Sequence, residues 1–248
     1  MGDRPLRLYA DCLATNGDEE VALGADAAQH ARVWRLAEGA ELELFDGAGV
    51  VAQAQLLKLS RSGLRCRIVQ RTVHAPPTRR VHLLVGLTRG EKPDLVVRMA
   101  TELGIASVRL VVCERSVARE RSGSDRSARL ALIARAACAQ SGNPFLPHIE
   151  SARSLAEVVN DLPAVGPAQL RIALHERATG PLPVPAPAVA DIWALVGPEG
   201  GLAADEVALL AERDFVLANL RTPILRAETA ALVAVARLTG FGPAIMTP

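Results

Sequence analysis

The stretch LVGPEGGLAADEVALL, Leu195 to Leu210, joins an apolar run to a helical pattern through a turn of three glycines, a proline and a carboxylate. The run has the length of a strand, and two acidic residues enter the first turn of the helix, where they suit the positive end of its dipole. Glycine has no Cβ, so we expect Gly200 and Gly201 to let a ligand approach bare backbone. A strand-turn-helix of this kind places a ligand beyond the carboxyl end of a parallel sheet.

The turn does not match the fingerprints of nucleotide-binding loops. A dinucleotide site needs G-x-G-x-x-G early in its domain, and a phosphate-cradling loop ends in Gly-Lys-Ser/Thr, whereas this turn reads G-P-E-G-G and comes late in the chain. Glu199 in its middle would repel a pyrophosphate. We therefore expect a neutral or cationic ligand.

The residues on either side of this turn predict an α/β domain. Apolar runs of strand length alternate with helical stretches, as in VHLLVGL before PDLVVRMATEL and FVLAN before RAETAALVAVARLTG. Near-continuous apolar strands that alternate with helices are typical of a parallel sheet covered on both faces.

The N-terminal part has a different pattern. Short segments of alternating polarity, punctuated by Asn16-Gly17, Asp46-Gly47 and Ser62-Gly63, surround one helical stretch from Ala25 to Leu36. This favours a small β-barrel with a single helix. Two prolines at residues 74–80 break the pattern, so we predict two domains, residues 1–73 and 74–248.

Composition excludes several classes of protein. Of 248 residues, 50% are apolar but only 3% are aromatic, so the core must be largely aliphatic. No apolar run is long enough to cross a membrane, and MGDRPLRLYADCL lacks the order of a signal peptide, which leads us to expect a cytoplasmic protein with no membrane partner. The cysteines Cys12, Cys66, Cys113 and Cys138 have no metal-ligand or disulfide spacing, so we expect no metal.

Charge is distributed unevenly along the chain. The net charge is only +1, but residues 79–135 hold 12 basic and 6 acidic residues, a net of +6. A phosphate-bearing partner would explain this excess, because arginine binds phosphate bidentately. A solvated helix face would explain it equally well, and both interpretations stay open.

Two motifs together resemble a known family. VGPEGGL at 196–202 and ILRAETA at 224–230 resemble the SPOUT class of RNA methyltransferases and, within it, the RsmE family, which methylates N3 of a uridine in 16S ribosomal RNA. Other segments fall in the family's order, so the resemblance covers nearly the whole chain. These segments are RLYA at 7–10, HARVWRL at 30–36, LFDG at 44–47, TRGEK at 88–92, TELGI at 101–105, QSGN at 140–143 and LHER at 174–177.

The resemblance implies an architecture and a cofactor. The N-terminal part would be a PUA-like β-barrel, and the C-terminal part a SPOUT domain with a trefoil knot, homodimeric through that knot. S-adenosyl-L-methionine would lie among the loops of the knot. The residues that the resemblance places around it are Leu174, His175, Glu176, Val196, Gly197, Pro198, Glu199, Gly200, Gly201, Asn219, Leu220, Ile224, Leu225, Ala227, Glu228 and Thr229.

Methylating uridine N3 requires removal of its proton and stabilisation of the resulting anion. As proton acceptors we consider Glu199 and Glu228, two carboxylates within the cofactor loops. As the group that stabilises the anion we consider Arg226. A carboxylate in a first helical turn commonly serves the helix end instead, so Glu228 is also a candidate cap of the final helix.

RNA contacts are expected from arginines in both domains. The resemblance points to Arg7, Arg32 and Arg35 in the barrel, and Arg89 and Arg115 are further candidates; each is equally a candidate surface ion pair. Trp34 stands among the barrel arginines. We expect it in the core rather than stacked on a base, because the chain has only two tryptophans.

The chain departs from the family at several positions. Arg221 and Pro223 stand where the family has the glycine and first arginine of Leu-Gly-x-Arg-Ile-Leu-Arg, and Ala139 and Asn143 stand for a glutamate and an arginine. These changes leave two alternatives open: a SPOUT enzyme with another RNA target, such as a ribose 2′-hydroxyl, and an RNA-binding protein without turnover. A nucleotide-dependent dehydrogenase is disfavoured because its glycine fingerprint is missing.

Overall fold

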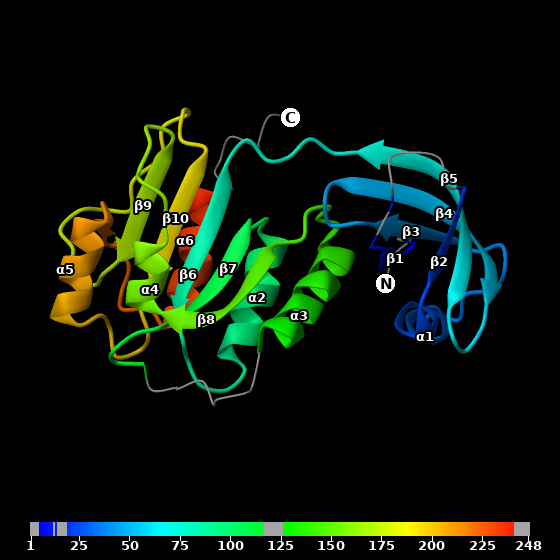
Figure 1. Cartoon of the computed structure of the whole chain (residues 1–248), viewed down its shortest axis with the longest axis horizontal. Helices are drawn as coiled ribbons and strands as arrows, with labels where there is room; N and C mark the ends of the chain where they lie inside the picture. Colours follow the sequence, from blue (N-terminus) through cyan, green and yellow to red (C-terminus); the bar gives the residue numbers. More distant parts are fainter. Residues whose placement is uncertain (1–4, 12, 14–18, 117–125, 241–248) are drawn as a thin grey trace. The chain divides into compact units, whose positions relative to one another are not determined.

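A computed structural model of the chain describes residues 5–11, 13, 19–116 and 126–240 (Figure 1). The chain divides into two compact units. The first comprises residues 1–76 and 135–146, and the second comprises residues 77–134 and 147–248. Each unit holds its own β-sheet.

The first unit is a curled five-stranded sheet with one helix. The strands lie in the order β1-β3-β4-β5-β2, with β1 parallel to β3 and the other neighbours antiparallel. Two register shifts between β4 and β5 break the ladder, and such irregularities increase the bend of a sheet. Its elements are β1 (Leu6–Tyr9), β2 (Glu20–Leu23), α1 (Ala25–Val33), β3 (Glu41–Phe45), β4 (Val50–Leu59) and β5 (Leu64–Val73).

The end of helix α3 (Arg126–Ser141) and the segment after it pack within this first unit. The guanidinium of Arg135 lies 4.3 Å from the centre of the Tyr9 ring, and a Cβ on Gly49 would lie 2.8 Å from the ring of Phe145. Gly142, at φ +85°, ends the helix. The QSGN segment therefore serves as a helix terminus.

The second unit is a six-stranded, all-parallel sheet in the order β11-β9-β10-β6-β7-β8. Helices α2 and α6 pack against each other, with α6 also on β6 and β10, while α4 and α5 form a second helix pair; Figure 1 shows α6 behind the sheet and α4 in front of it. The predicted α/β class is confirmed. The elements are β6 (Arg80–Gly86), α2 (Lys92–Glu102), β7 (Ser107–Val112), β8 (His148–Ser154), α4 (Leu155–Asn160), β9 (Gln169–Leu174), β10 (Asp191–Val196), α5 (Ala204–Glu212), β11 (Val216–Ala218) and α6 (Ala227–Leu238).

Three features of the fold differ from the sequence patterns. Strand β8, of sequence HIESARS, lies at the edge of the sheet and needs no continuous apolar run, so its pattern did not predict a strand. Helix α4 was not among the predicted helices. It is short, and a capping box between Ser154 and Glu157 stabilises its first turn. Helix α1 ends at Val33 rather than Leu36, because Arg35 adopts φ +55° and the Leu36 amide donates to the Ala31 carbonyl.

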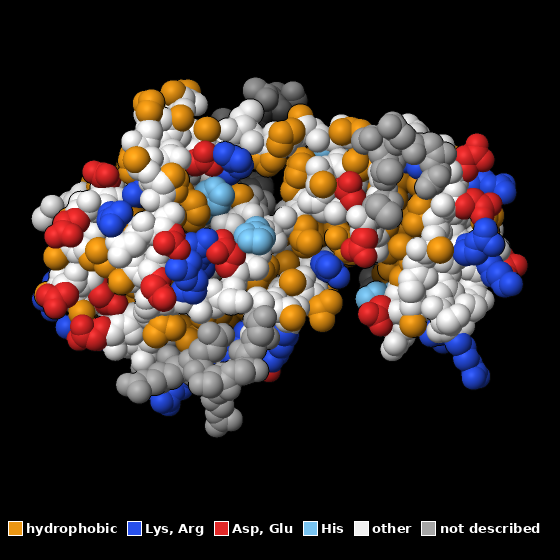
Figure 2. Space-filling model, viewed as in Figure 1, with side chains coloured by type: hydrophobic (Ala, Val, Ile, Leu, Met, Phe, Trp, Pro, Cys, Tyr) orange, Lys and Arg blue, Asp and Glu red, His pale blue; other side chains and the backbone are white. Residues whose placement is uncertain are grey.

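Ion pairs account for part of the basic segment at residues 79–135. Arg80 pairs with Asp191, Arg109 with Glu150 and Arg129 with Asp94. On the face seen in Figure 2, basic and acidic side chains lie interspersed over the second unit. No helix in the described ranges is long and apolar enough to span a membrane.

Candidate functional site

The loops that follow β9, β10 and β11 enclose a cavity of about 530 Å³. These three strands are neighbours and parallel, so their carboxyl ends meet at one edge of the sheet. Every residue predicted to bind the cofactor lines this cavity except Glu228 and Thr229. Leu202, Ala218, Thr222, Pro223, Arg226 and Ala230 line it as well.

Asn219 fastens two of these loops together. Its side-chain amide donates to the Glu176 carbonyl at 2.6 Å, and its backbone amide donates to the Gly180 carbonyl at 2.8 Å. Its side-chain oxygen accepts from the Arg221 amide at 2.7 Å. The loops after β9 and β11 are therefore held as one wall of the cavity.

Arg221 adopts a backbone conformation that favours glycine. Its φ is +57°, in the left-handed region that glycine adopts without strain. The Arg221 guanidinium donates to the Thr179 carbonyl, and this bond ties the strained residue to the opposite loop. The departure at Arg221 thus preserves the path of the chain.

The glycines of the VGPEGG turn allow close contact with protein backbone. A Cβ on Gly200 would lie 2.9 Å from both the Cβ and the carbonyl oxygen of Arg115, and a Cβ on Gly86 at the end of β6 would lie 2.3 Å from the Pro198 nitrogen. Gly201 turns the chain at φ +73°. Gly200 and Gly201 both line the cavity, and the missing Cβ of Gly200 also makes room for the Arg115 segment.

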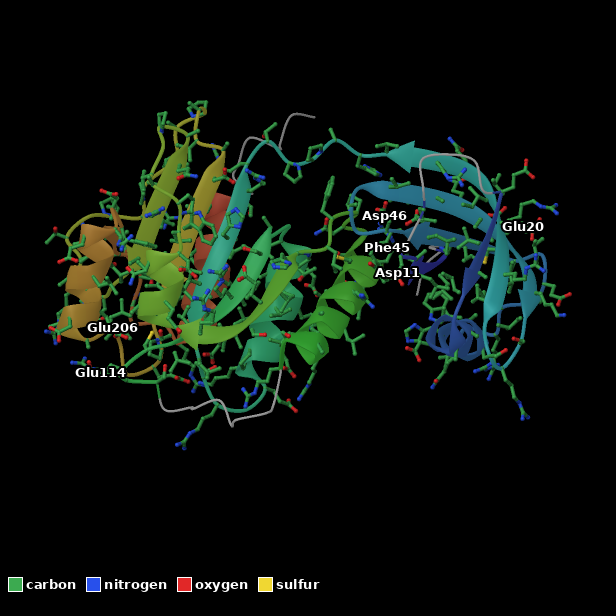
Figure 3. All side chains as sticks on the ribbon, in the orientation of Figure 1. Asp11, Glu20, Phe45, Asp46, Glu114 and Glu206 are labelled. Carbon is green, nitrogen blue, oxygen red and sulfur yellow. The ribbon has the colours of Figure 1, made fainter. Side chains whose placement is uncertain are left out.

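Glu206 secures that same segment. In the first turn of α5, its carboxylate accepts from the Glu114 amide at 2.8 Å and from the Ala203 amide at 2.8 Å. Figure 3 labels Glu206 and Glu114, which lie close together near α5. The first-turn carboxylate therefore both supports the helix start and holds the loop after β7.

A lysine that sequence reasoning did not single out links the two candidate carboxylates. Nζ of Lys92, at the start of α2, donates to Oε1 of Glu199 at 2.6 Å and lies 3.6 Å from Oε2 of Glu228. The three residues come from α2, the turn after β10 and the first turn of α6. TRGEK was visible as a family motif, but nothing in its spacing indicated this contact.

Glu228 does not take the place expected for it. It lies in the first turn of α6 but makes no cap hydrogen bond, because Arg226 is the N-cap and no side chain caps that end. Its Oε2 is buried and has no hydrogen-bond partner among the described residues. Glu228 therefore contacts Lys92 and is not among the residues that line the cavity.

Glu199 is ionised in this setting. Burial acts to raise its pKa, but the hydrogen bond from Lys92, a backbone hydrogen bond and the charge of Lys92 together outweigh burial, so the pKa of the carboxyl is lowered below its usual value. The same bond raises the pKa of the Lys92 ammonium. At neutral pH the two groups form an ion pair at the rim of the cavity.

The candidate arginines of the second unit are all exposed. Arg226 lines the cavity at the N-cap of α6, and Arg115 reaches the Gly200 carbonyl at 3.5 Å. Arg89 follows β6 on the loop that leads to Lys92. Each side chain thus lies on a loop at the carboxyl edge of the sheet, where a substrate must approach the cavity.

Arg7 in the first unit is a structural residue. Its side chain is only 8% exposed, its Nε lies 2.9 Å from Oε1 of Glu43, and its guanidinium lies 4.8 Å from the centre of the Phe45 ring. A buried, paired guanidinium is not available to a phosphate. The expected RNA contact at Arg7 does not fit this geometry.

Trp34 lies on the surface, so its expected place in the core is wrong. The side chain is 50% exposed, and neighbouring Val33 is 72% exposed. Arg32 and Arg35 flank it and are exposed too, with Arg32 donating to the Ser60 carbonyl at 2.7 Å. An exposed aromatic ring with exposed arginines beside it in the sequence is a combination that suits single-stranded nucleic acid.

Comparison with known proteins places the chain in a family. A sequence profile described as an RNA methyltransferase domain matches residues 75–239, and one described as an RNA methyltransferase PUA domain matches residues 13–69. Ribosomal RNA small subunit methyltransferase E of Mycobacterium bovis is 32% identical over 232 residues, which cover 91% of this chain and 88% of that protein. The chain belongs to the ribosomal RNA small subunit methyltransferase E family.

Other relatives agree with this membership. The family member of Bacillus subtilis is 25% identical, over 84% of each chain. A crystal structure of the family member of Neisseria gonorrhoeae, bound to S-adenosyl methionine, aligns with a TM-score of 0.83 at 27% identity and covers 94% of this chain and 96% of its own. The resemblance and the fold class inferred from the sequence, a SPOUT-type α/β domain with a PUA-like β domain, are confirmed.

Proposed function

We propose that this protein transfers a methyl group from S-adenosyl-L-methionine to N3 of a uridine in 16S ribosomal RNA of the small ribosomal subunit. Family membership supports the reaction class and the ribosomal substrate. The observation that carries the proposal is the cavity at the ends of β9, β10 and β11, which the family's three cofactor loops enclose.

The cavity suits this cofactor in size and chemistry. Its volume of about 530 Å³ falls within the roughly 300–1,000 Å³ of small-molecule sites. Leucine, valine and alanine side chains and glycine backbone line it, with carboxylates at Glu176 and Glu199. Carboxylates favour the cationic sulfonium of S-adenosyl-L-methionine over a pyrophosphate, and when bound the cofactor supplies the methyl group.

Glu199 is our choice of proton acceptor. It lines the cavity and its side chain is 36% exposed, whereas Glu228 is 12% exposed and lies outside the lining. A general base must come within hydrogen-bond reach of the proton that it removes. Arg226, exposed at the cavity, would stabilise negative charge as it develops on the uracil oxygens.

We propose that RNA contacts come from exposed arginines of each unit. In the first unit these are Arg32 and Arg35 on either side of Trp34, and in the second they are Arg89 and Arg115. Arginines of this kind position a phosphate backbone, and the exposed indole would stack on an unpaired base.

We further propose that the protein acts as a homodimer in the cytoplasm, where its ribosomal substrate is assembled. The resemblance to the family implies dimerisation through the knot, and Ile224, on the cavity loop after β11, has an apolar side chain that is 90% exposed. Light scattering of the purified protein would test this, with twice the mass of the chain expected.

Calorimetry tests the cofactor assignment. We expect saturable binding of S-adenosyl-L-methionine and no binding of a nicotinamide dinucleotide, because the carboxylate of Glu199 in the cavity lining would repel a pyrophosphate. Binding of the dinucleotide without the methyl donor would overturn the assignment. Gly86→Ala serves as a negative control with weakened binding of S-adenosyl-L-methionine, because its Cβ would displace Pro198 of the cofactor turn.

A further inference from the structure

Lys92 lies between two carboxylates that differ in surroundings. Its ammonium is 2.6 Å from Oε1 of Glu199 and 3.6 Å from Oε2 of Glu228. Glu199 is 36% exposed and lines the cavity, whereas Glu228 is 12% exposed and does not. Only Glu199 is therefore placed to reach a substrate.

The buried oxygen of Glu228 lacks a donor. Oε2 is inaccessible to solvent and has no hydrogen-bond partner among the described residues. A buried acceptor left unpaired is costly, so a partner within reach is expected. Lys92 forms an ion pair with it at 3.6 Å, and a shift of about 1 Å would shorten this distance to an ordinary hydrogen-bond length.

Glu199 is a weak base while Lys92 holds it. The ammonium stabilises the charged carboxylate, and this stabilisation must be lost before the carboxylate takes a proton readily. A second acceptor would keep the Lys92 ammonium paired with a carboxylate after the Glu199 side chain has moved away. Glu228, whose buried Oε2 has no hydrogen bond within the described part of the chain, already lies 3.6 Å from that ammonium.

We propose that Lys92 is the positioning residue of Glu199 and that Glu228 is its second partner, to which the ammonium moves when Glu199 turns toward the uridine. The inference rests on the proposed function. In this step the N3–H bond breaks, an O–H bond forms on Glu199, and the electron pair left on N3 forms the bond to the methyl carbon. The carbon–sulfur bond of the methyl donor would break, and its electron pair would stay on the sulfur of a neutral thioether that leaves. The Lys92–Glu228 ion pair remains, and Glu199 later releases its proton to water.

A double-mutant cycle separates this role from a direct action of Glu228. We expect Lys92→Gln and Glu228→Gln each to lower kcat about 10- to 100-fold, a cost of the size seen when a group that orients a metal ligand is removed. The affinity for S-adenosyl-L-methionine should change less than about threefold. Because Glu228 acts through Lys92, the double variant should match Lys92→Gln alone. Losses that multiply would overturn the inference.

Conservative variants and a matched lysine provide the controls. Lys92→Arg should restore most of the activity lost in Lys92→Gln, since it keeps a cation between the carboxylates. Lys58→Gln removes the other lysine of the chain, which lies in the first unit, and should leave kcat unchanged. Equal kcat in Lys92→Gln and wild type would also overturn the inference.

A second readout needs neither RNA nor cofactor. The chain has two lysines, so ¹³C-lysine labelling gives two side-chain NMR signals, and Lys58→Gln identifies that of Lys92. The pKa of Lys92 should lie above its usual value and fall in Glu199→Gln. An unchanged Lys92 titration in Glu199→Gln contradicts the ion pair. If the titration responds while wild type transfers no methyl group to 16S rRNA, the proposed function fails and the ion pair stands.

Discussion

Lys92 and Glu199 are separated by 107 positions in the sequence, yet Nζ of the lysine lies 2.6 Å from Oε1 of the glutamate. This bond joins the start of α2 to the glycine turn that follows β10, because β6 and β10 are parallel neighbours whose carboxyl ends meet. The adjacent strands thus place a cation from one loop beside a carboxylate from the next. The arrangement of the proposed catalytic residues follows from the strand order of the sheet.

Gly86 should tolerate no side chain. A Cβ there would lie 2.3 Å from the Pro198 nitrogen, which belongs to backbone and cannot move aside cheaply. We expect Gly86→Ala to lower the free energy of unfolding by about 1–3 kcal/mol, as overpacking does, and to weaken binding of S-adenosyl-L-methionine. Gly166→Ala is the matched control, because a Cβ there meets nothing within 4 Å. Equal stability of the two variants in denaturant titrations would contradict this packing.

Trp34 should contribute to RNA affinity and little to stability. Its side chain is 50% exposed, and stacking on one base is worth about 1–3 kcal/mol, so Trp34→Ala should weaken binding of a 16S rRNA fragment about 5- to 150-fold. In a Trp193→Phe background Trp34 is the remaining tryptophan, and its fluorescence should be quenched by RNA. Unaltered fluorescence at saturating RNA would show that the indole does not stack.

Arg7 should contribute to stability and little to RNA affinity, the reverse of Trp34. It is 8% exposed and paired with Glu43, and a charged hydrogen bond is worth about 1.5–3 kcal/mol, so Arg7→Ala should destabilise the first unit by about that amount. Arg65→Ala removes an exposed pair with Glu20 and should cost less than about 1 kcal/mol. RNA affinity that falls in Arg7→Ala at full folding would restore Arg7 as an RNA contact.

His82 should make stability depend on pH. Its ring stacks on Trp193 and burial lowers its pKa below the usual 6.5, although Asp191 acts to raise it. The unfolded chain then binds this proton more readily than the folded one, so stability is lost as pH falls from about 6.5 toward the native pKa. Denaturant titrations between about pH 5 and 7 should show a smaller slope for His82→Gln than for His148→Gln, whose histidine is 76% exposed. Identical slopes would contradict the prediction.

The fold was predictable where local pattern and final environment agree. The central strands β6, β9 and β10 are largely buried and carry near-continuous apolar runs, so their sequences predicted them. Edge strand β8 has no such run because one side of the strand has no neighbour. Its identity depends on pairing with β7, which no local pattern encodes.

The sequence predicted which loops form the candidate site, but it did not predict the contacts between their side chains. The VGPEGG and ILRAETA motifs identified the cavity loops, since turn residues are chosen for local geometry. The link from Lys92 to Glu199 depends on strand order, and the burial of Arg7 depends on pairing with Glu43, and neither is a local property. Trp34 was assigned to the core on composition, but α1 ends one residue before it and leaves it at the surface.

Methyl transfer to small ribosomal subunits tests the central claim most directly. Subunits from a strain that lacks this protein would be incubated with the purified protein and isotope-labelled S-adenosyl-L-methionine, and the digested 16S rRNA would be analysed by mass spectrometry. We predict one labelled nucleoside, a uridine methylated at N3, and none with Glu199→Gln. Label on a ribose 2′-hydroxyl, or no label in RNA although the cofactor binds, would contradict the account.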